Sequence, residues 1–90
     1  MDILKVFGGN VKKYREELGL SQEAFAVRCG LHRTYISAVE RQRRSIALGN
    51  VQKIADALGV ETYRLFLEEG ERPEDGSAGD RANEPISPAR

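Results

Sequence analysis

Residues 20–40 read LSQEAFAVRCGLHRTYISAVE, and this stretch decides the fold. It holds two short helical patterns, Gln22–Cys29 and Arg33–Arg41, on either side of the tripeptide Gly30-Leu31-His32. Ser21 is a good N-cap because its hydroxyl can accept a hydrogen bond from an amide in the first turn. Gly30 can adopt the left-handed conformation in which many helices end. The stretch therefore predicts two short helices joined by a tight turn.

This arrangement is the signature of a helix-turn-helix, in which a turn of three or four residues that contains Gly joins two short helices. The second helix carries short polar side chains and Arg on one face, which suits a helix that enters the major groove of DNA. Residues 28–44 contain one acidic residue, Glu40, and five arginines: Arg28, Arg33, Arg41, Arg43 and Arg44. We therefore expect a surface that contacts phosphates.

The formal net charge of zero conceals a segregation of charge along the chain. Residues 1–68 carry 4 Lys and 7 Arg against 8 Asp and Glu, a net charge of +3. Residues 69–90 carry 3 Arg against 6 Asp and Glu, a net charge of −3. Charge asymmetry between parts of a chain favours a nucleic-acid partner.

Apolar residues at helical spacing predict three further helices around the same core. The expected buried faces are Phe7, Val11, Tyr14 and Leu18; Phe25, Ala26 and Cys29; Ile36 and Val39; Leu48, Val51, Ile54, Ala55 and Leu58; and Leu65 and Phe66. The last of these helices is expected over roughly Thr62 to Glu68. No β-period is evident, so we predict an all-α, compact five-helix domain over residues 1–68.

From residue 69 onward the composition changes to Glu, Asp, Gly, Pro, Ser and Arg, with Ile86 as the single large aliphatic residue. Such a stretch buries too little apolar surface to offset the entropy of ordering it. We predict that residues 69–90 form a disordered acidic tail. The tail could compete with DNA for the basic surface, or it could simply keep the protein soluble.

Several classes of protein are disfavoured by the composition. The single cysteine, Cys29, rules out a disulfide framework within one chain and fits a reducing, cytoplasmic setting. The N-terminal apolar run is short and interrupted by Lys5, so we expect neither a signal peptide nor a membrane span. The residues offer no nucleophile–base pair, phosphate loop or metal-ligand cluster. We expect no enzyme activity, no metal, no cofactor and no small-molecule ligand.

Taken together, these residues resemble the Cro/C1-type (XRE-like) helix-turn-helix transcriptional regulators over about Phe7 to Phe66. The matching residues are Gly19-Leu20-Ser21-Gln22-Glu23, Phe25-Ala26, Gly30-Leu31, Ile36-Ser37, Glu40-Arg41, Ile54-Ala55 and Ala57-Leu58-Gly59-Val60. Within that family the segment Leu31–Ser37 looks most like the small controller proteins of restriction–modification systems. The resemblance implies a five-helix, lambda-repressor-like fold that binds operator DNA as a dimer.

The resemblance also assigns expected roles to individual residues. Arg33 and Thr34 open the second helix of the motif and would read base edges, with Ser37 and Ala38 one turn further on. Arg15 and Glu40 would form a partly buried salt bridge between the first and third helices. The expected phosphate-binding residues are Gln22, His32, Tyr35, Arg41, Arg43 and Arg44. For Tyr35, a purely structural ring is nearly as good an interpretation.

Three apolar residues in a row, Leu65, Phe66 and Leu67, close the predicted domain. One or two of them can belong to the core. A helix at the edge of so small a domain cannot bury every side, so the others are expected in a dimer interface.

The sequence departs from the family pattern around the third helix. His32 occupies the usual Ser, Thr or Asp cap position, and Gln42 replaces a frequent Gly. Ala47 stands where a Ser often caps the fourth helix, and Gly49-Asn50 weaken its first turn. These changes concern the geometry of the loop between the third and fourth helices.

The leading hypothesis is a sequence-specific regulator that binds double-stranded DNA as a homodimer on a pseudopalindromic operator. One alternative is an antitoxin with the same DNA-binding fold, whose tail or fifth helix binds a toxin enzyme. Another is a protein-interaction module that has the fold but does not bind DNA.

Overall fold

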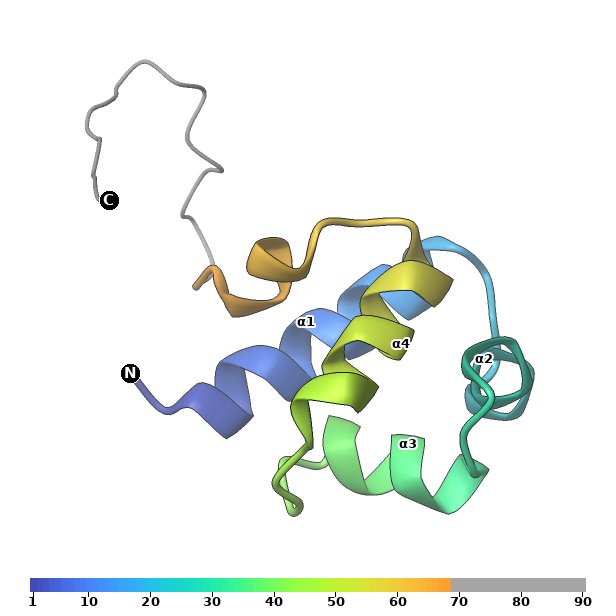
Figure 1. Cartoon of the computed structure of the whole chain (residues 1–90), viewed down its shortest axis with the longest axis horizontal. Coiled ribbons are helices and arrows are strands. Elements are labelled where there is room, and N and C mark those ends of the chain that lie inside the picture. Colours follow the sequence, from blue (N-terminus) through green and yellow to red (C-terminus); the bar gives the residue numbers. More distant parts are fainter. Residues whose placement is uncertain (69–90) are drawn as a thin grey trace.

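The computed structural model describes residues 1–68, which form four α-helices and one short 3-10 helix (Figure 1). The elements are α1 (Ile3–Glu17), α2 (Gln22–Cys29), α3 (Arg33–Glu40), α4 (Leu48–Leu58) and η1 (Thr62–Phe66). The described residues contain no strand, so the all-α prediction is confirmed for this part of the chain. The prediction of a fifth α-helix is wrong, because η1 is a 3-10 helix that ends at Phe66.

The end of η1 is hydrogen-bonded to α1. Asn10 donates hydrogen bonds from its Nδ2 to the carbonyl oxygens of Leu65, at 2.9 Å, and Leu67, at 2.8 Å. At Leu67 the backbone is already extended, with φ −85° and ψ 132°. The Asn10 side chain therefore ties the end of the described chain to α1.

The caps of α2 follow the sequence prediction. The Ser21 hydroxyl accepts a hydrogen bond from the Ala24 amide at 3.0 Å. Gly30 ends the helix with φ +74°, and the Leu31 amide then donates to the Ala26 carbonyl at 3.0 Å. These bonds satisfy backbone groups that the helix itself leaves unpaired. They also set the sharp turn into α3.

One hydrophobic core joins all five elements. Its largest fully buried side chains come from each of them: Val11, Phe25, Ile36, Ile54 and Leu65. Two residues predicted for the core are instead at the surface, since Leu18 is 45% exposed and Leu48 is 85% exposed. Leu18 lies at the C-cap of α1 and Leu48 at the first position of α4, where the helix no longer faces the core.

The backbones of α1 and α3 approach each other closely at Gly8. A Cβ atom on Gly8 would lie 2.3 Å from the carbonyl oxygen of Val39, a distance that heavy atoms do not tolerate. Gly8 itself is buried. The absence of a side chain at this position lets α3 sit directly against α1, and this contact sets where α3 lies.

The predicted acidic tail, residues 69–90, lies outside the described residues. Among the helices of residues 1–68, none is long and apolar enough to cross a membrane.

Candidate nucleic-acid interface

The helix α3 has one buried side and one side that faces outward. Ile36 and Val39 are buried in the core. Arg33 and Thr34 are exposed at its N-terminal end, and Ser37 and Ala38 are half-buried one turn further along. Residues four apart share a face of a helix, so the two pairs follow each other along the outward side. The four predicted base-reading residues therefore form one stripe, with Arg33 and Thr34 as its accessible end.

His32 is the N-cap of α3, although histidine is not one of the usual capping residues. Its Nδ1 accepts a hydrogen bond from the Thr34 amide at 3.4 Å and lies 2.9 Å from the Thr34 hydroxyl. The backbone of His32 is extended, with φ −76° and ψ 144°. The histidine thus takes the place of a Ser, Thr or Asp cap, and its side chain is directed along the start of α3.

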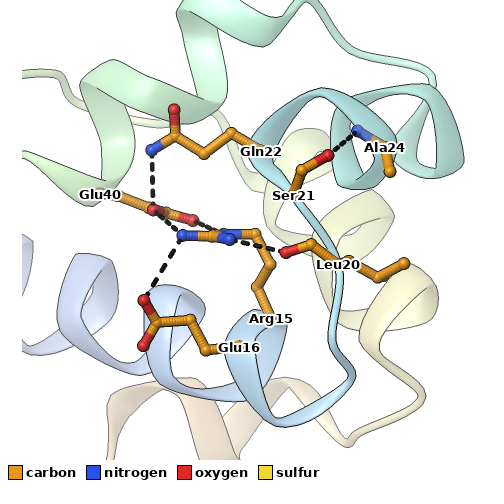
Figure 2. Close-up of polar contacts among 7 residues, drawn as sticks. All are labelled: Arg15, Glu16, Leu20, Ser21, Gln22, Ala24 and Glu40. Atoms are coloured by element: carbon orange, nitrogen blue, oxygen red, sulfur yellow. Dashed lines mark hydrogen bonds and ion pairs between the residues drawn. The ribbon is translucent and has the colours of Figure 1, made fainter.

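The inner end of α3 is held by a buried ion pair (Figure 2). Arg15 donates from Nε to Glu40 Oε2 at 2.6 Å and from Nη2 to Glu40 Oε1 at 3.0 Å. Arg15 is 8% exposed and Glu40 is 7% exposed. The structure thus brings together the two residues that the family resemblance pairs, and it gives them the two-pronged geometry of strong arginine–carboxylate contacts.

Further groups complete this network. The Arg15 Nη1 donates to the Leu20 carbonyl at 2.7 Å, and the Gln22 amide nitrogen donates to Glu40 Oε1 at 3.0 Å. The hydrogen bond to Glu40 is the main cause that raises the pKa of Arg15 above its ordinary value, against the opposing effect of burial. Because nearly all polar atoms of the pair have partners, α1, α2 and α3 are fixed relative to one another.

Gln22 is one of the predicted phosphate-binding residues, and in the structure its side chain contacts Glu40. Its amide nitrogen is engaged by Glu40, while the amide oxygen points away from that carboxylate (Figure 2). The side chain is half-buried between α2 and α3. Gln22 therefore braces α3 whether or not it also contacts DNA.

Tyr35 links α3 to the loop and to α4. Its hydroxyl oxygen accepts a hydrogen bond from the Asn50 side chain at 3.2 Å. The guanidinium of Arg44 lies over its ring, 5.0 Å from the centroid. Among the described residues the hydroxyl hydrogen of Tyr35 has no acceptor, so it is available to donate outward. Tyr35, Arg44 and Asn50 therefore form one polar cluster.

The loop after α3 carries the remaining arginines. Arg41, Arg43 and Arg44 are all exposed. Gln42 between them has φ +65°, a left-handed conformation that glycine adopts without strain and other residues adopt at a cost. Ala47 at the start of α4 gives no side-chain cap. The two departures from the family pattern thus leave the loop intact but strained at Gln42 and uncapped at α4.

The three residues predicted for a dimer interface have different surroundings. Leu65 is fully buried in the core of the single chain, so its side chain has no surface to offer a second copy. This burial confirms the prediction that at least one of the three residues belongs to the core, and Leu65 is therefore not retained as an interface residue. Phe66 is half-buried with its ring 5.2 Å from the ring of Phe7. Leu67 is half-buried at the end of the described chain and remains a candidate with Phe66.

Cys29 lies on the core side of α2 and is 7% exposed. Burial raises the pKa of its thiol to about 11, and the neighbouring Arg28 opposes this effect only in part. A thiol in this state is mostly protonated at neutral pH and is a weak nucleophile. Residues 1–68 contain no group of three His, Cys, Asp or Glu side chains placed to hold a metal ion.

Asn10 and Asn50 are structural residues that the sequence did not reveal. Asn10 closes the domain across 55 and 57 residues of chain, and Asn50 meets Tyr35 across 15. No pattern local to either asparagine points to its distant partner. The sequence indicated only that Asn50 weakens the first turn of α4.

Comparison with known proteins finds the helix-turn-helix fold and several similar proteins. A family model described as helix-turn-helix matches residues 11–65. The control protein C.SmaI of Serratia marcescens is 41% identical over 76 residues, which cover 84% of this chain and 90% of that protein. The crystal structure of a hypothetical transcription factor from Neisseria is 50% identical, with a TM-score of 0.74 and 76% of each chain covered.

A third similar protein was solved on DNA. The restriction-modification controller protein C.Esp1396I, a tetramer in complex with its natural 35-base-pair operator, is 34% identical with a TM-score of 0.66. The match covers 71% of this chain and 84% of that one. The family model spans more than half of the present chain and C.SmaI matches it over most of its length. The chain therefore belongs to the Cro/C1-type helix-turn-helix family of transcriptional regulators and is similar within it to the controller proteins of restriction–modification systems.

Proposed function

We propose that the protein is a sequence-specific regulator of transcription that binds an operator in double-stranded DNA as a homodimer. Residues 1–68 are the DNA-binding unit in this proposal. Its relation to restriction–modification controller proteins makes control of such a system the most specific form of the hypothesis.

The outward end of α3 carries the proposal. Arg33 and Thr34 are exposed at the N-terminal end of a helix whose opposite side is fixed by the core and by the Arg15–Glu40 pair. Arginine can donate two hydrogen bonds to guanine O6 and N7, and threonine offers a hydroxyl and a methyl group. A rigid helix with such residues at its open end is suited to read bases in a major groove.

The residues around α3 supply contacts that do not depend on sequence. Arg41, Arg43 and Arg44 are exposed cations beside the proposed reading helix, and the Tyr35 hydroxyl can donate a hydrogen bond outward. Contacts of this kind set the register of a protein on DNA, while base contacts specify the site. Gln22 and His32 complete the proposed phosphate-binding set from the first turns of α2 and α3.

A dimer would place two copies of α3 on one side of the duplex. For helix-turn-helix dimers, the two half-sites lie about one helical turn apart, roughly 34 Å along the DNA. The tetramer of C.Esp1396I on its operator supports binding by more than one copy. Phe66 and Leu67 are the proposed interface residues.

Selection of bound DNA from a random library tests the proposal. The full chain should enrich a sequence with two related half-sites, and absence of any enrichment would contradict the proposed function. Arg33→Ala should then weaken binding to the selected site by about 1–3 kcal/mol and relax the base preference at one position of each half-site. Arg64→Ala on η1 removes the same charge away from α3 and should leave that preference unchanged. Equal weakening by Arg33→Ala on selected and random DNA would instead make Arg33 a phosphate contact.

A further inference from the structure

His32 and Thr34 are in direct contact at the exposed start of α3. The His32 Nδ1 lies 2.9 Å from Thr34 Oγ1 and 3.4 Å from the Thr34 backbone nitrogen. The residue that begins α3 is thus joined to one of the two residues proposed to read bases. A histidine at this cap position is itself a departure from the Ser, Thr or Asp of the family pattern.

The Thr34 amide decides the state of the imidazole. A backbone N–H can only donate a hydrogen bond, so the ring nitrogen that faces it must present its lone pair. We infer that Nδ1 of His32 is an acceptor and that the ring hydrogen is on Nε2.

This state of the ring determines the direction in which the hydrogen of the Thr34 hydroxyl points. With no hydrogen on Nδ1, the contact of 2.9 Å can be bridged only by the hydrogen of Thr34 Oγ1. A hydroxyl has one hydrogen, so an oxygen that donates it to His32 presents only lone pairs elsewhere. His32 is therefore a specificity-determining residue, because it makes Thr34 a hydrogen-bond acceptor toward DNA. This inference rests on the proposed function of α3.

An acceptor at this position discriminates between base edges in the major groove. Adenine N6 and cytosine N4 are amino groups that donate hydrogen bonds, whereas guanine O6 and thymine O4 only accept them. Thr34 would favour an amino-bearing base at the edge that it meets. A serine cap would impose no such choice, since its own hydroxyl can donate or accept, while an aspartate cap accepts only.

Three variants of the full chain test the inference in the same selection from random DNA. The wild type should show a base preference of about tenfold at one half-site position, and replacing the adenine N6 or cytosine N4 amino group there by hydrogen should abolish it. Thr34→Val keeps the shape of the side chain, removes the hydroxyl and should lose that preference. His32→Asp should retain it, although its charge lowers affinity for all DNA, and His32→Ser should reduce it to less than about threefold. Serine and aspartate are both favoured N-caps, so neither variant removes the start of α3.

Each outcome decides the inference. An unchanged preference in His32→Ser, or a Thr34-dependent preference that survives replacement of that amino group by hydrogen, would overturn it while leaving DNA binding established. Nitrogen NMR of the His32 ring in the free protein gives an answer without DNA, and we expect the hydrogen on Nε2. A hydrogen on Nδ1 would refute the inference even if the protein selects a clear operator. If the wild type enriches no sequence, the proposed function fails, and the ring measurement still decides the state of His32.

Discussion

Gly8 and Gly9 are neighbours in α1 with opposite requirements. A Cβ atom on Gly8 would collide with the Val39 carbonyl, whereas one on Gly9 would meet nothing within 4 Å. We expect Gly8→Ala to lower the free energy of unfolding by about 1–3 kcal/mol, because α1 and α3 must separate. Gly9→Ala should raise it by up to about 1 kcal/mol, since alanine favours an exposed helix interior. Urea unfolding of both variants checks this, and equal effects would show that α1 and α3 do not touch at Gly8.

Tyr35 and Arg44 make different kinds of proposed DNA contact although they touch each other. Tyr35→Phe removes an uncharged donor and should weaken binding to selected and random DNA alike by about 1 kcal/mol. The dependence of the binding constant on salt should stay as in the wild type.

Arg44→Ala removes a cation and should reduce the slope of log K against log salt by about 1. Titrations at several salt concentrations separate the two effects. If Tyr35→Phe changed the salt slope as well, the ring would act chiefly by positioning Arg44.

One buried carboxylate on α3, Glu40, is paired with Arg15 of α1, and a nearby glutamate provides a matched control. Glu40 is buried in two short contacts with Arg15, while Glu16 meets the same arginine at 3.9 Å from an exposed position. Glu40→Gln leaves a buried arginine without its counter-ion and should cost about 3–5 kcal/mol of stability. Glu16→Gln should change stability by less than about 1 kcal/mol. Thermal unfolding measures both, and similar losses would mean that the buried pair does not hold α3.

The helices were predictable from the sequence where their signals are local. Ser21, Gly30 and the apolar spacing were enough to place α2 and α3. The same period gave most buried positions of α4, but it wrongly included Leu48, which is exposed, and missed Ala57. The type of η1 was not predictable, because a five-residue segment fits a 3-10 helix and an α-helix equally well. Its end is hydrogen-bonded to Asn10, which lies 55 residues away in the sequence from Leu65.

The candidate site was predictable in its residues and less so in its connections. Family resemblance placed Arg33 and Thr34 at the start of α3, where the structure has them exposed. Two of these connections arise only when separate helices pack together: the contact between Tyr35 and Asn50, and the hydrogen bond from Gln22 to Glu40. The burial of Leu65 agrees with the expected buried face of the last helix. The sequence did not show, however, that this burial leaves Leu65 no surface for a second copy.

For the molecule as a whole, the proposed dimer gives a test that does not involve DNA. Leu67 is half-buried and only its backbone carbonyl is held by Asn10, so a charged side chain there should leave the fold intact. We expect Leu67→Glu to shift the chain toward monomer in analytical ultracentrifugation. Val27 on α2 is 78% exposed, and Val27→Glu should leave the association unchanged. Loss of association in both variants, or in neither, would place the interface elsewhere.

The side of α3 that carries Arg33 is not the side that holds the helix in place. This separation has a consequence for how the DNA-binding preference of such a protein can evolve. The contacts that hold the helix come from the core, Gly8, Arg15, Gln22 and Tyr35, and none of them uses the exposed side chain of Arg33. Substitutions of exposed residues away from such contacts seldom alter stability by more than about 0.5 kcal/mol. New binding preferences can therefore arise by point mutation at Arg33 without a compensating change elsewhere, and a library randomised at this position would consist mostly of folded proteins.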